Sequence, residues 1–117
     1  MNIETIYKYC LGKKGAVEDY PFDEETLVFK VANKMFALIP LEKIPLQINL
    51  KCDPEKAVEL REEYENVQPG WHMSKKHWNT VIIDGNIRWS DVKQWIDHSY
   101  DEVVKGLNKS EREKIFK

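Results

Sequence analysis

The sequence predicts an α+β domain in which a mostly antiparallel sheet carries its helices on one face. Segments with helical periodicity alternate with short β-rich runs, and the first two β-rich runs are close enough to form a hairpin. The order is one helix, several strands, a helix, further strands and two final helices. A chain of 117 residues has the size of one ordinary domain, so we expect a single domain over residues 1–117.

The first helix is predicted over residues 3–11, where apolar side chains share one helical face between an N-cap, Asn2, and a C-cap glycine, Gly12. Residues 13–22 read as an irregular connection, because Pro21 opposes a helix there. Asp53 followed by Pro54 is a strong helix start.

The longest helix is predicted from Ser90, as its cap, to about Leu107. Its inner face should consist of Val92, Trp95, Ile96, Ser99, Tyr100, Val103 and Leu107. Ser110 and Glu113 have the spacing of a capping box, which predicts a short last helix.

The strands follow from β-rich composition and alternation. Residues 27–31 and 35–39 flank Ala32-Asn33-Lys34, and Asn33 tolerates the positive φ of a tight hairpin turn. The other β-rich runs are the alternating residues 46–50, the short residues 67–70, which read as an extended piece or a turn, and residues 78–83, which end at the turn Asp84-Gly85.

Charge is balanced overall but uneven along the chain. The sequence has 18 basic and 20 acidic residues, and such a balance disfavours strong non-specific nucleic-acid binding without excluding a local basic patch. Residues 18–25 carry five acidic residues and no Lys or Arg. Residues 71–95 carry four basic and two acidic residues.

A cytoplasmic protein without membrane attachment is expected. The N-terminal residues lack the basic and apolar regions of a secretory signal, and the longest apolar run, residues 35–39, is far too short to span a bilayer. Cys10 and Cys52 are far apart and outside any C-x-x-C motif. We therefore expect two reduced, at least partly buried thiols.

No catalytic, cofactor or metal pattern is found, so the chain is not expected to be an enzyme. His72 and His77 with Asp84 or Asp97 form the best metal set, but exposed loop histidines explain them more simply. Asp97 and His98 are neighbours on a helix, and their side chains should diverge. A nucleophile elbow and a phosphate-binding glycine loop are both absent.

The segment from Gly70 to Thr80 has the most distinctive composition, with two Trp, two His and two Lys in eleven residues. Cations, an amide and flat rings suit phosphate contacts and stacking on bases or sugars. Alternatively, the tryptophans anchor a long loop to the core while the lysines face water.

At this segment the chain resembles the MmcQ/YjbR family of small bacterial proteins. The most specific match is Lys75-Lys-His-Trp-Asn-Thr80 followed by Asp84-Gly85. Supporting matches are spread over the chain at Tyr20-Pro-Phe22, Phe29-Lys30, Lys34-Met-Phe-Ala37, Leu50-Lys51, Asp53-Pro54, Pro69-Gly70 and Ser99-Tyr100.

The resemblance implies a compact α+β fold similar to CyaY-like and secretion-chaperone-like folds. It also implies DNA binding through two protruding hairpins, a double wing, which correspond here to the hairpin at Asn33-Lys34 and the loop at 72–79. On this hypothesis Lys34, Lys51, Lys75 and Lys76, with Lys30 as an addition, contact phosphate, and His72, His77 and Asn79 add hydrogen bonds.

Two further classes of function stay open. A protein-interaction or chaperone-like module would be favoured by an exposed apolar patch around Trp71 and Trp89. A deep pocket holding a His beside a carboxylate would favour an enzyme or small-ligand binder. With no partner indicated by the residues, we expect a monomer.

Overall fold

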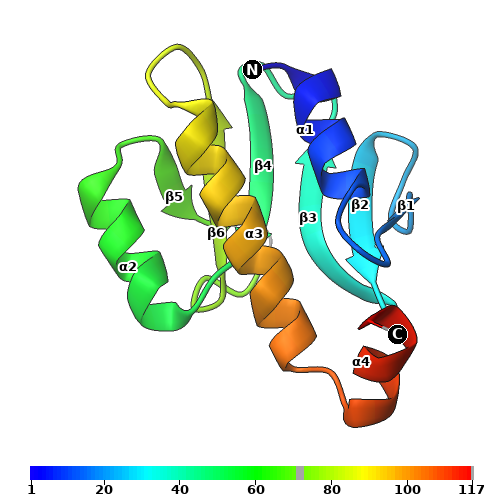
Figure 1. Ribbon diagram of the computed structural model, residues 1–117. Coiled ribbons are helices and arrows are strands. Elements are labelled where there is room, and N and C mark those ends of the chain that lie inside the picture. The colour runs from blue at the N-terminus through cyan, green and yellow to red at the C-terminus, as the bar shows by residue number, and fades with distance from the viewer. Residues whose placement is uncertain (71–72, 117) are drawn as a thin grey trace.

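The computed structural model describes residues 1–70 and 73–116, and within these residues six strands form one antiparallel sheet (Figure 1). The strand order is β1-β2-β3-β4-β6-β5, and every neighbouring pair is antiparallel. The strands are β1 (Val17–Asp19), β2 (Thr26–Val31), β3 (Lys34–Pro40), β4 (Leu46–Lys51), β5 (Val67–Pro69) and β6 (Trp78–Ile83). The expected α+β class with a mostly antiparallel sheet is confirmed.

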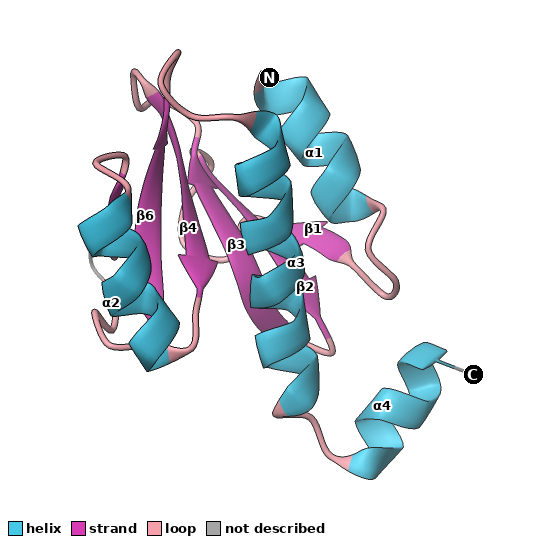
Figure 2. Cartoon of the chain, turned by 60° about the vertical axis from the view of Figure 1, so that its left-hand side comes forward, coloured by secondary structure: helices cyan, strands magenta, loops and turns pink. Residues whose placement is uncertain are grey.

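The helices over the described residues are α1 (Ile3–Leu11), α2 (Pro54–Glu63), α3 (Trp89–Lys105) and α4 (Lys109–Phe116). Figure 2 shows α1 and α3 side by side on one face of the sheet, with α2 beside the β5–β6 edge and α4 beyond the end of α3. The predicted inner face of the longest helix is confirmed for the six of its seven residues that lie in α3, all of which are buried. The seventh, Leu107, is buried just beyond the end of the helix. Over residues 1–70 and 73–116, the opposite face of the sheet carries no helix, and we call it the helix-free face.

A β-bulge at Phe36 links the sheet to α3. Phe29 pairs with Ala37 and Lys30 pairs with Met35, so Phe36 is the extra residue of β3. Its buried ring packs edge-on against Tyr100 of α3, with the ring centres 5.4 Å apart. Ser99 is fully buried beside it, donating to the Phe36 carbonyl and accepting from the Lys51 amide. The bulge therefore turns an additional aromatic side chain into the core beneath the helices.

The hairpin between β2 and β3 closes through a two-residue turn. Ala32 and Asn33 both have positive φ, 49° and 64°, as a type I′ turn requires. The expected role of Asn33 is confirmed. Residues 13–22, predicted as an irregular connection, contain the strand β1. All three of its residues are exposed, so no hydrophobic alternation marks it in the sequence. Its strand geometry comes from pairing with β2.

Two predicted helix starts are confirmed and two are wrong. Asn2 and Asp53 each accept a backbone hydrogen bond as N-caps. The longest helix begins at Trp89, one residue before the predicted cap, and its N-terminus has no side-chain cap. The last helix is capped two residues early, because the Asn108 side chain accepts from the Glu111 amide while Glu111 accepts from the Asn108 amide.

Both cysteines are free and buried, as expected. Burial raises the pKa of Cys10 to about 12 and that of Cys52 to about 11. Both therefore stay protonated near neutral pH, where thiols are poor nucleophiles. Among the described residues, no helix combines the length and the apolar character that crossing a bilayer requires.

Candidate nucleic-acid interface at one end of the sheet

Strand direction brings four separate lysines to one end of the sheet. Lys34 begins β3, Lys51 ends β4, and Lys75 and Lys76 lie just before β6. Because β3 and β4 are antiparallel, as are β4 and β6, the start of β3, the end of β4 and the start of β6 share one end. We call this group, with His77, the basic end.

Lys34 and Lys51 line one hollow of about 270 Å³. The rest of its described lining is mainly apolar and consists of Met35, Trp78, Val103 and Gly106. Lys51 pairs with Trp78 across β4 and β6, and the Cys52 amide donates to the carbonyl of His77. The loop before β6 therefore lies next to the strand residues that line the hollow.

The four lysines of the basic end carry uncompensated charge. Lys34, Lys75 and Lys76 are exposed and Lys51 is half-buried. Within residues 1–70 and 73–116, none of the four is within ion-pair distance of a carboxylate. Lys30 differs, because its ammonium lies 2.9 Å from the Asp19 carboxylate. The charge of Lys30 is thus paired with a carboxylate of the same chain, and the expectation that Lys30 adds a phosphate contact is not supported.

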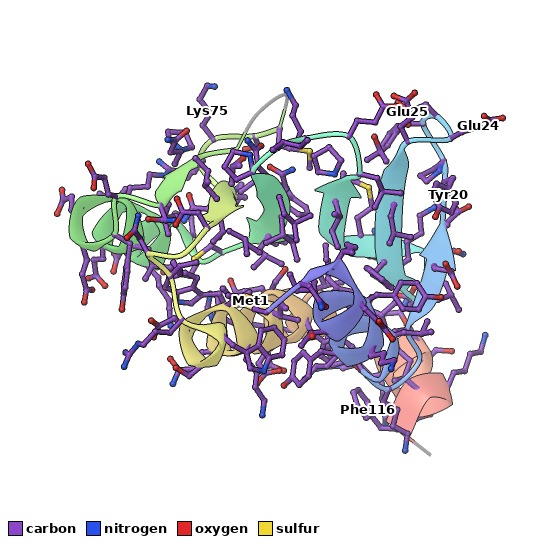
Figure 3. All side chains as sticks on the ribbon, turned by 90° about the horizontal axis from the view of Figure 1, so that it is seen from above. Met1, Tyr20, Glu24, Glu25, Lys75 and Phe116 are labelled. Carbon is purple, nitrogen blue, oxygen red and sulfur yellow. The ribbon has the colours of Figure 1, made fainter. Side chains whose placement is uncertain are left out.

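Arg61 of α2 fixes the backbone of the loop before β6. Its Nη2 donates to the carbonyls of Lys75 and Trp78, and its Nε donates to the Asn79 side chain at 2.7 Å. With the backbone held, the Lys75 side chain extends on the side of the sheet opposite α1 and α3 (Figure 3). The sequence indicated Arg61 only by its helical spacing, because a contact between α2 and a loop beyond β5 leaves no local signal.

Asn79 was predicted to contact nucleic acid, and the structure contradicts this prediction. It is only 3% exposed, it accepts from Arg61, and it donates to the carbonyl of Ala57 at 3.3 Å. Alternation along β6 points Asn79 toward α2, while Trp78 points to the helix-free face. Asn79 is therefore a structural link and is not available for a nucleic-acid contact. His77 is exposed, and His72 lies outside the described residues.

Trp78 anchors the loop, as the alternative interpretation of the segment proposed. It is 9% exposed and packs with Val28 and Leu38, with Met35 and Met73 against the same cluster. The backbone of Gly70 passes so close that an added Cβ would lie 2.8 Å from the Cβ of Trp78. Only glycine fits there without displacing the strand. The second tryptophan, Trp71, lies outside the described residues.

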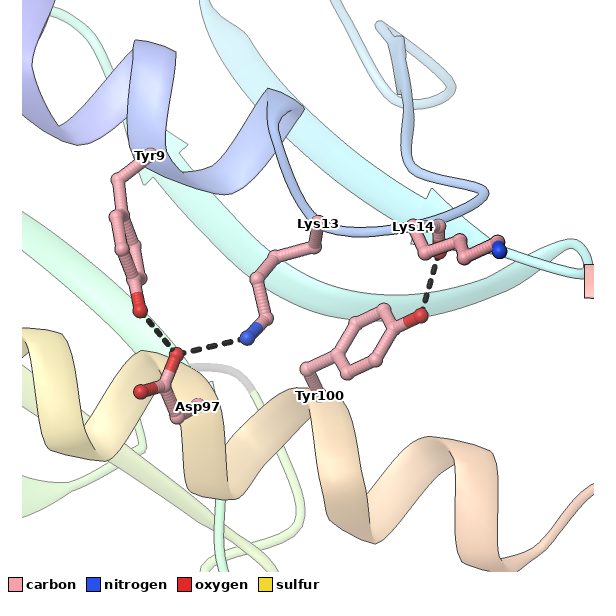
Figure 4. Close-up of polar contacts among 5 residues, drawn as sticks. All are labelled: Tyr9, Lys13, Lys14, Asp97 and Tyr100. Atoms are coloured by element: carbon pink, nitrogen blue, oxygen red, sulfur yellow. Dashed lines mark hydrogen bonds and ion pairs between the residues drawn. The ribbon is translucent and has the colours of Figure 1, made fainter. Parts of the chain in front are cut away.

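The remaining candidate groups have structural partners. The Asp97 carboxylate accepts from Tyr9 and from Lys13, the latter at 2.8 Å, and Tyr100 donates to the carbonyl of Lys14 (Figure 4). Although burial alone would raise it, the pKa of Asp97 is lowered because Lys13 and Tyr9 bond the carboxylate.

His98 points elsewhere, as helical spacing predicts, and its Nε2 accepts from the Asp53 amide at 3.1 Å. Burial, together with the nearby Lys56 ammonium, lowers the pKa of His98. Over the described part of the chain, no three His, Cys, Asp or Glu side chains gather in a way that would hold a metal ion.

Comparison with known proteins gives matches that point to one family. A family model described as YjbR matches residues 11–102. The uncharacterised protein YjbR of Escherichia coli K12 is 32% identical over 112 residues, which cover 96% of this chain and 95% of that protein.

Two further matches extend the comparison. The uncharacterised protein YbdF of Escherichia coli O157:H7 is 37% identical over 97 residues, covering 82% of this chain and 79% of that protein. The crystal structure of Deinococcus radiodurans protein DR2400, domain DUF419, superposes with a TM-score of 0.91 at 37% identity, covering 97% of this chain and 87% of that one.

Proposed function

The chain belongs to the YjbR family, and from this premise we propose that it is a non-enzymatic DNA-binding protein whose basic end contacts phosphate. The observation that carries the proposal is the meeting of Lys34, Lys51, Lys75 and Lys76 at one end of the sheet without carboxylate partners in the described chain. Lysines in that state can neutralise DNA phosphates and displace the cations condensed on the duplex, and this counterion release drives non-specific binding.

Charge separation across the molecule reconciles the proposal with the net charge of −2. Figure 3 shows Glu24 and Glu25 toward the β1–β2 edge of the sheet and Lys75 toward its other edge. Thr26 pairs with Pro40, so the loop before β2 also lies at the end of β3 that is remote from Lys34. A DNA duplex approaching the basic end therefore meets cations first, while the acidic loop between β1 and β2 stays distant and disfavours other orientations.

The hairpin and the loop play different parts in this proposal. The tight turn at Ala32-Asn33 holds Lys34 on a rigid hairpin, and Arg61 holds the backbone that carries Lys75 and Lys76. Both supports are set before a ligand arrives, which lowers the entropy cost of binding. Among the described residues, the proposed DNA contacts are therefore Lys34, Lys51, Lys75, Lys76 and His77.

Fluorescence anisotropy with random duplex and single-stranded oligonucleotides at about 50 and 200 mM salt tests the proposal. We expect binding that weakens steeply with salt, and a Lys75→Ala/Lys76→Ala double variant should weaken it equally for all sequences. Loss of two phosphate contacts should lower the slope of log K against log salt by roughly two.

A matched control is Lys8→Ala/Lys93→Ala, which removes the same charge from exposed positions on α1 and α3. It should bind nearly as the wild type does, because those helices cover the other face of the sheet. Equal loss in the two double variants would mean that only net charge matters, and binding unaffected by Lys75→Ala/Lys76→Ala would exclude this loop as the contact.

The protein-interaction alternative is supported by a different surface. Trp89 does not contribute, since it is half-buried with its ring edge-on to Tyr9. Phe22 and Ile44 are instead 62% and 95% exposed, on the two turns that follow β1 and β3. Absence of oligonucleotide binding at the lower salt would favour this alternative, and a pull-down compared between wild type and Phe22→Ser/Ile44→Ser would test it.

A further inference from the structure

The helix-free face contains a second hollow of about 400 Å³. We call it the face pocket. Its described lining consists of Phe22, Thr26, Leu38, Pro40, Lys43, Gln47, Asn49 and Met73. Half of these side chains are apolar. The size lies in the range of small-molecule sites, which combine apolar walls with a few polar groups.

Asn49 gives the pocket floor an unused donor group. The residue is only 7% exposed, and its Oδ1 accepts from the Thr80 hydroxyl at 2.5 Å. Within the described residues its Nδ2 has no hydrogen-bond acceptor. Among the described residues, no fully buried side-chain nitrogen or oxygen lacks a hydrogen-bond partner, so the Nδ2 of Asn49 is open to the hollow. It can therefore donate to whatever enters the pocket.

Lys43 is the only charged residue in the described lining, and no carboxylate among residues 1–70 and 73–116 pairs with it. Thr26 and Gln47 add further hydrogen-bonding groups next to it. The polar side of the pocket thus combines one cation with donors, whereas Phe22, Leu38 and Met73 provide an apolar side. This distribution is complementary to a molecule with an apolar body and an anionic head.

We infer that the face pocket binds a small organic anion, such as an aromatic or aliphatic carboxylate, with its apolar body on Leu38 and Met73 and its anionic head toward Lys43 and Asn49. The inference does not rest on DNA binding, because none of the described residues that line the face pocket also lines the Lys34–Lys51 hollow. It assigns a ligand site to the helix-free face.

The test uses 8-anilinonaphthalene-1-sulfonate as an anionic probe and N-phenyl-1-naphthylamine as its neutral analogue. Native protein should enhance the fluorescence of both, and amide shifts in a titration followed by nuclear magnetic resonance should cluster at residues of the face pocket. Gln47→Trp should weaken the anionic probe at least about tenfold, because the new ring fills the pocket from a half-buried strand position.

Lys43→Met separates the charge from the apolar contacts. It should weaken the anionic probe by about threefold to tenfold while leaving the neutral analogue unchanged. Lys109→Met, at an exposed position on α4, is the matched control and should change neither. Unaltered near-ultraviolet circular dichroism establishes that each variant is folded.

Three results would overturn the inference: no fluorescence change with native protein, equal binding by Gln47→Trp, or amide shifts confined to other surfaces. If Gln47→Trp does not fold, Thr26→Trp fills the pocket from the neighbouring side and is judged by the same criteria. Oligonucleotide affinity should not respond to Gln47→Trp, so failure here is distinguishable from failure of the DNA-binding proposal.

Discussion

At the junction of α1 and α3, Lys13 is enclosed by protein groups, whereas at the basic end Lys75 and Lys76 extend into solvent. The Lys13 side chain is 22% exposed, bonds Asp97, and lies 5.0 Å from the ring centre of Tyr100 (Figure 4). A lysine with a carboxylate and aromatic rings around it holds two helices together. A lysine without them contributes little to folding and keeps its charge for an external ligand.

The backbone beneath the basic end is nevertheless tied to the interior, and Arg61→Ala should produce the largest loss of stability. It removes the donors to Lys75 and Trp78 and leaves the nearly buried Asn79 without its main partner. We expect a loss of about 3 kcal/mol in the free energy of unfolding, measured by urea denaturation. Arg112→Ala, on the exposed surface of α4, should change it by less than about 0.5 kcal/mol.

Asp97→Ala disrupts the junction of α1 and α3 and should cause the second-largest loss of stability. Lys13 and Tyr9 both lose their acceptor, but Asp97 is 39% exposed and water replaces part of the interaction. We expect a loss of about 2 kcal/mol in the same measurement. A double variant with Lys13→Met should recover part of this loss, and a double variant less stable than Asp97→Ala would mean that Lys13 stabilises the junction without Asp97.

Lys75→Ala/Lys76→Ala sharpens the comparison by its lack of effect on folding. Both side chains are exposed and unpaired within the described chain, so the free energy of unfolding should change by less than about 0.5 kcal/mol. Together with weaker oligonucleotide binding, that result would separate a binding surface from a structural one. A large loss of stability would show that the two lysines belong to the protein's own architecture.

His98, where α3 meets the start of α2, should give the smallest effect in this series, and that effect should depend on pH just below neutrality. Its folded pKa is lowered, so the unfolded chain binds a proton more readily than the folded one. The stabilisation is present above the ordinary histidine pKa and is lost as pH falls through it. His98→Gln keeps an acceptor that does not titrate.

Thermal melts between about pH 7.5 and 5.5 check this linkage. The wild type should lose more melting temperature on acidification than His98→Gln does, and identical pH profiles would show that the bond between His98 and Asp53 does not govern acid sensitivity.

Local patterns in the chain were sufficient for most of the fold. The periodicity of residues 92–107 predicted the buried face of α3, and β-rich composition placed β6 at Trp78–Ile83. Asn33 predicted the hairpin turn. Each of these features depends on residues a few positions apart, so hydrophobic alternation or a turn preference is enough to reveal it.

For the candidate site, the sequence located the lysines but could not show which of them are paired with a carboxylate in the folded chain. Lys30 and Lys34 are four residues apart, yet only Lys30 meets a carboxylate. Asn79 looked like a contact residue within a polar motif, and it is buried beneath Arg61. Whether a polar side chain faces a ligand or a neighbour depends on partners far along the chain.

The sequence by itself determined the helices, the main strands and the uneven distribution of charge, because each depends on residues that are close together in the chain. Only the tertiary structure decided the exposed strand β1, the bulge at Phe36, the anchoring of the basic end by Arg61 and the placement of the Asn49 side chain in the face pocket. These features arise where segments far apart in the chain meet, and the close packing that pairs or isolates a polar group exists only after folding.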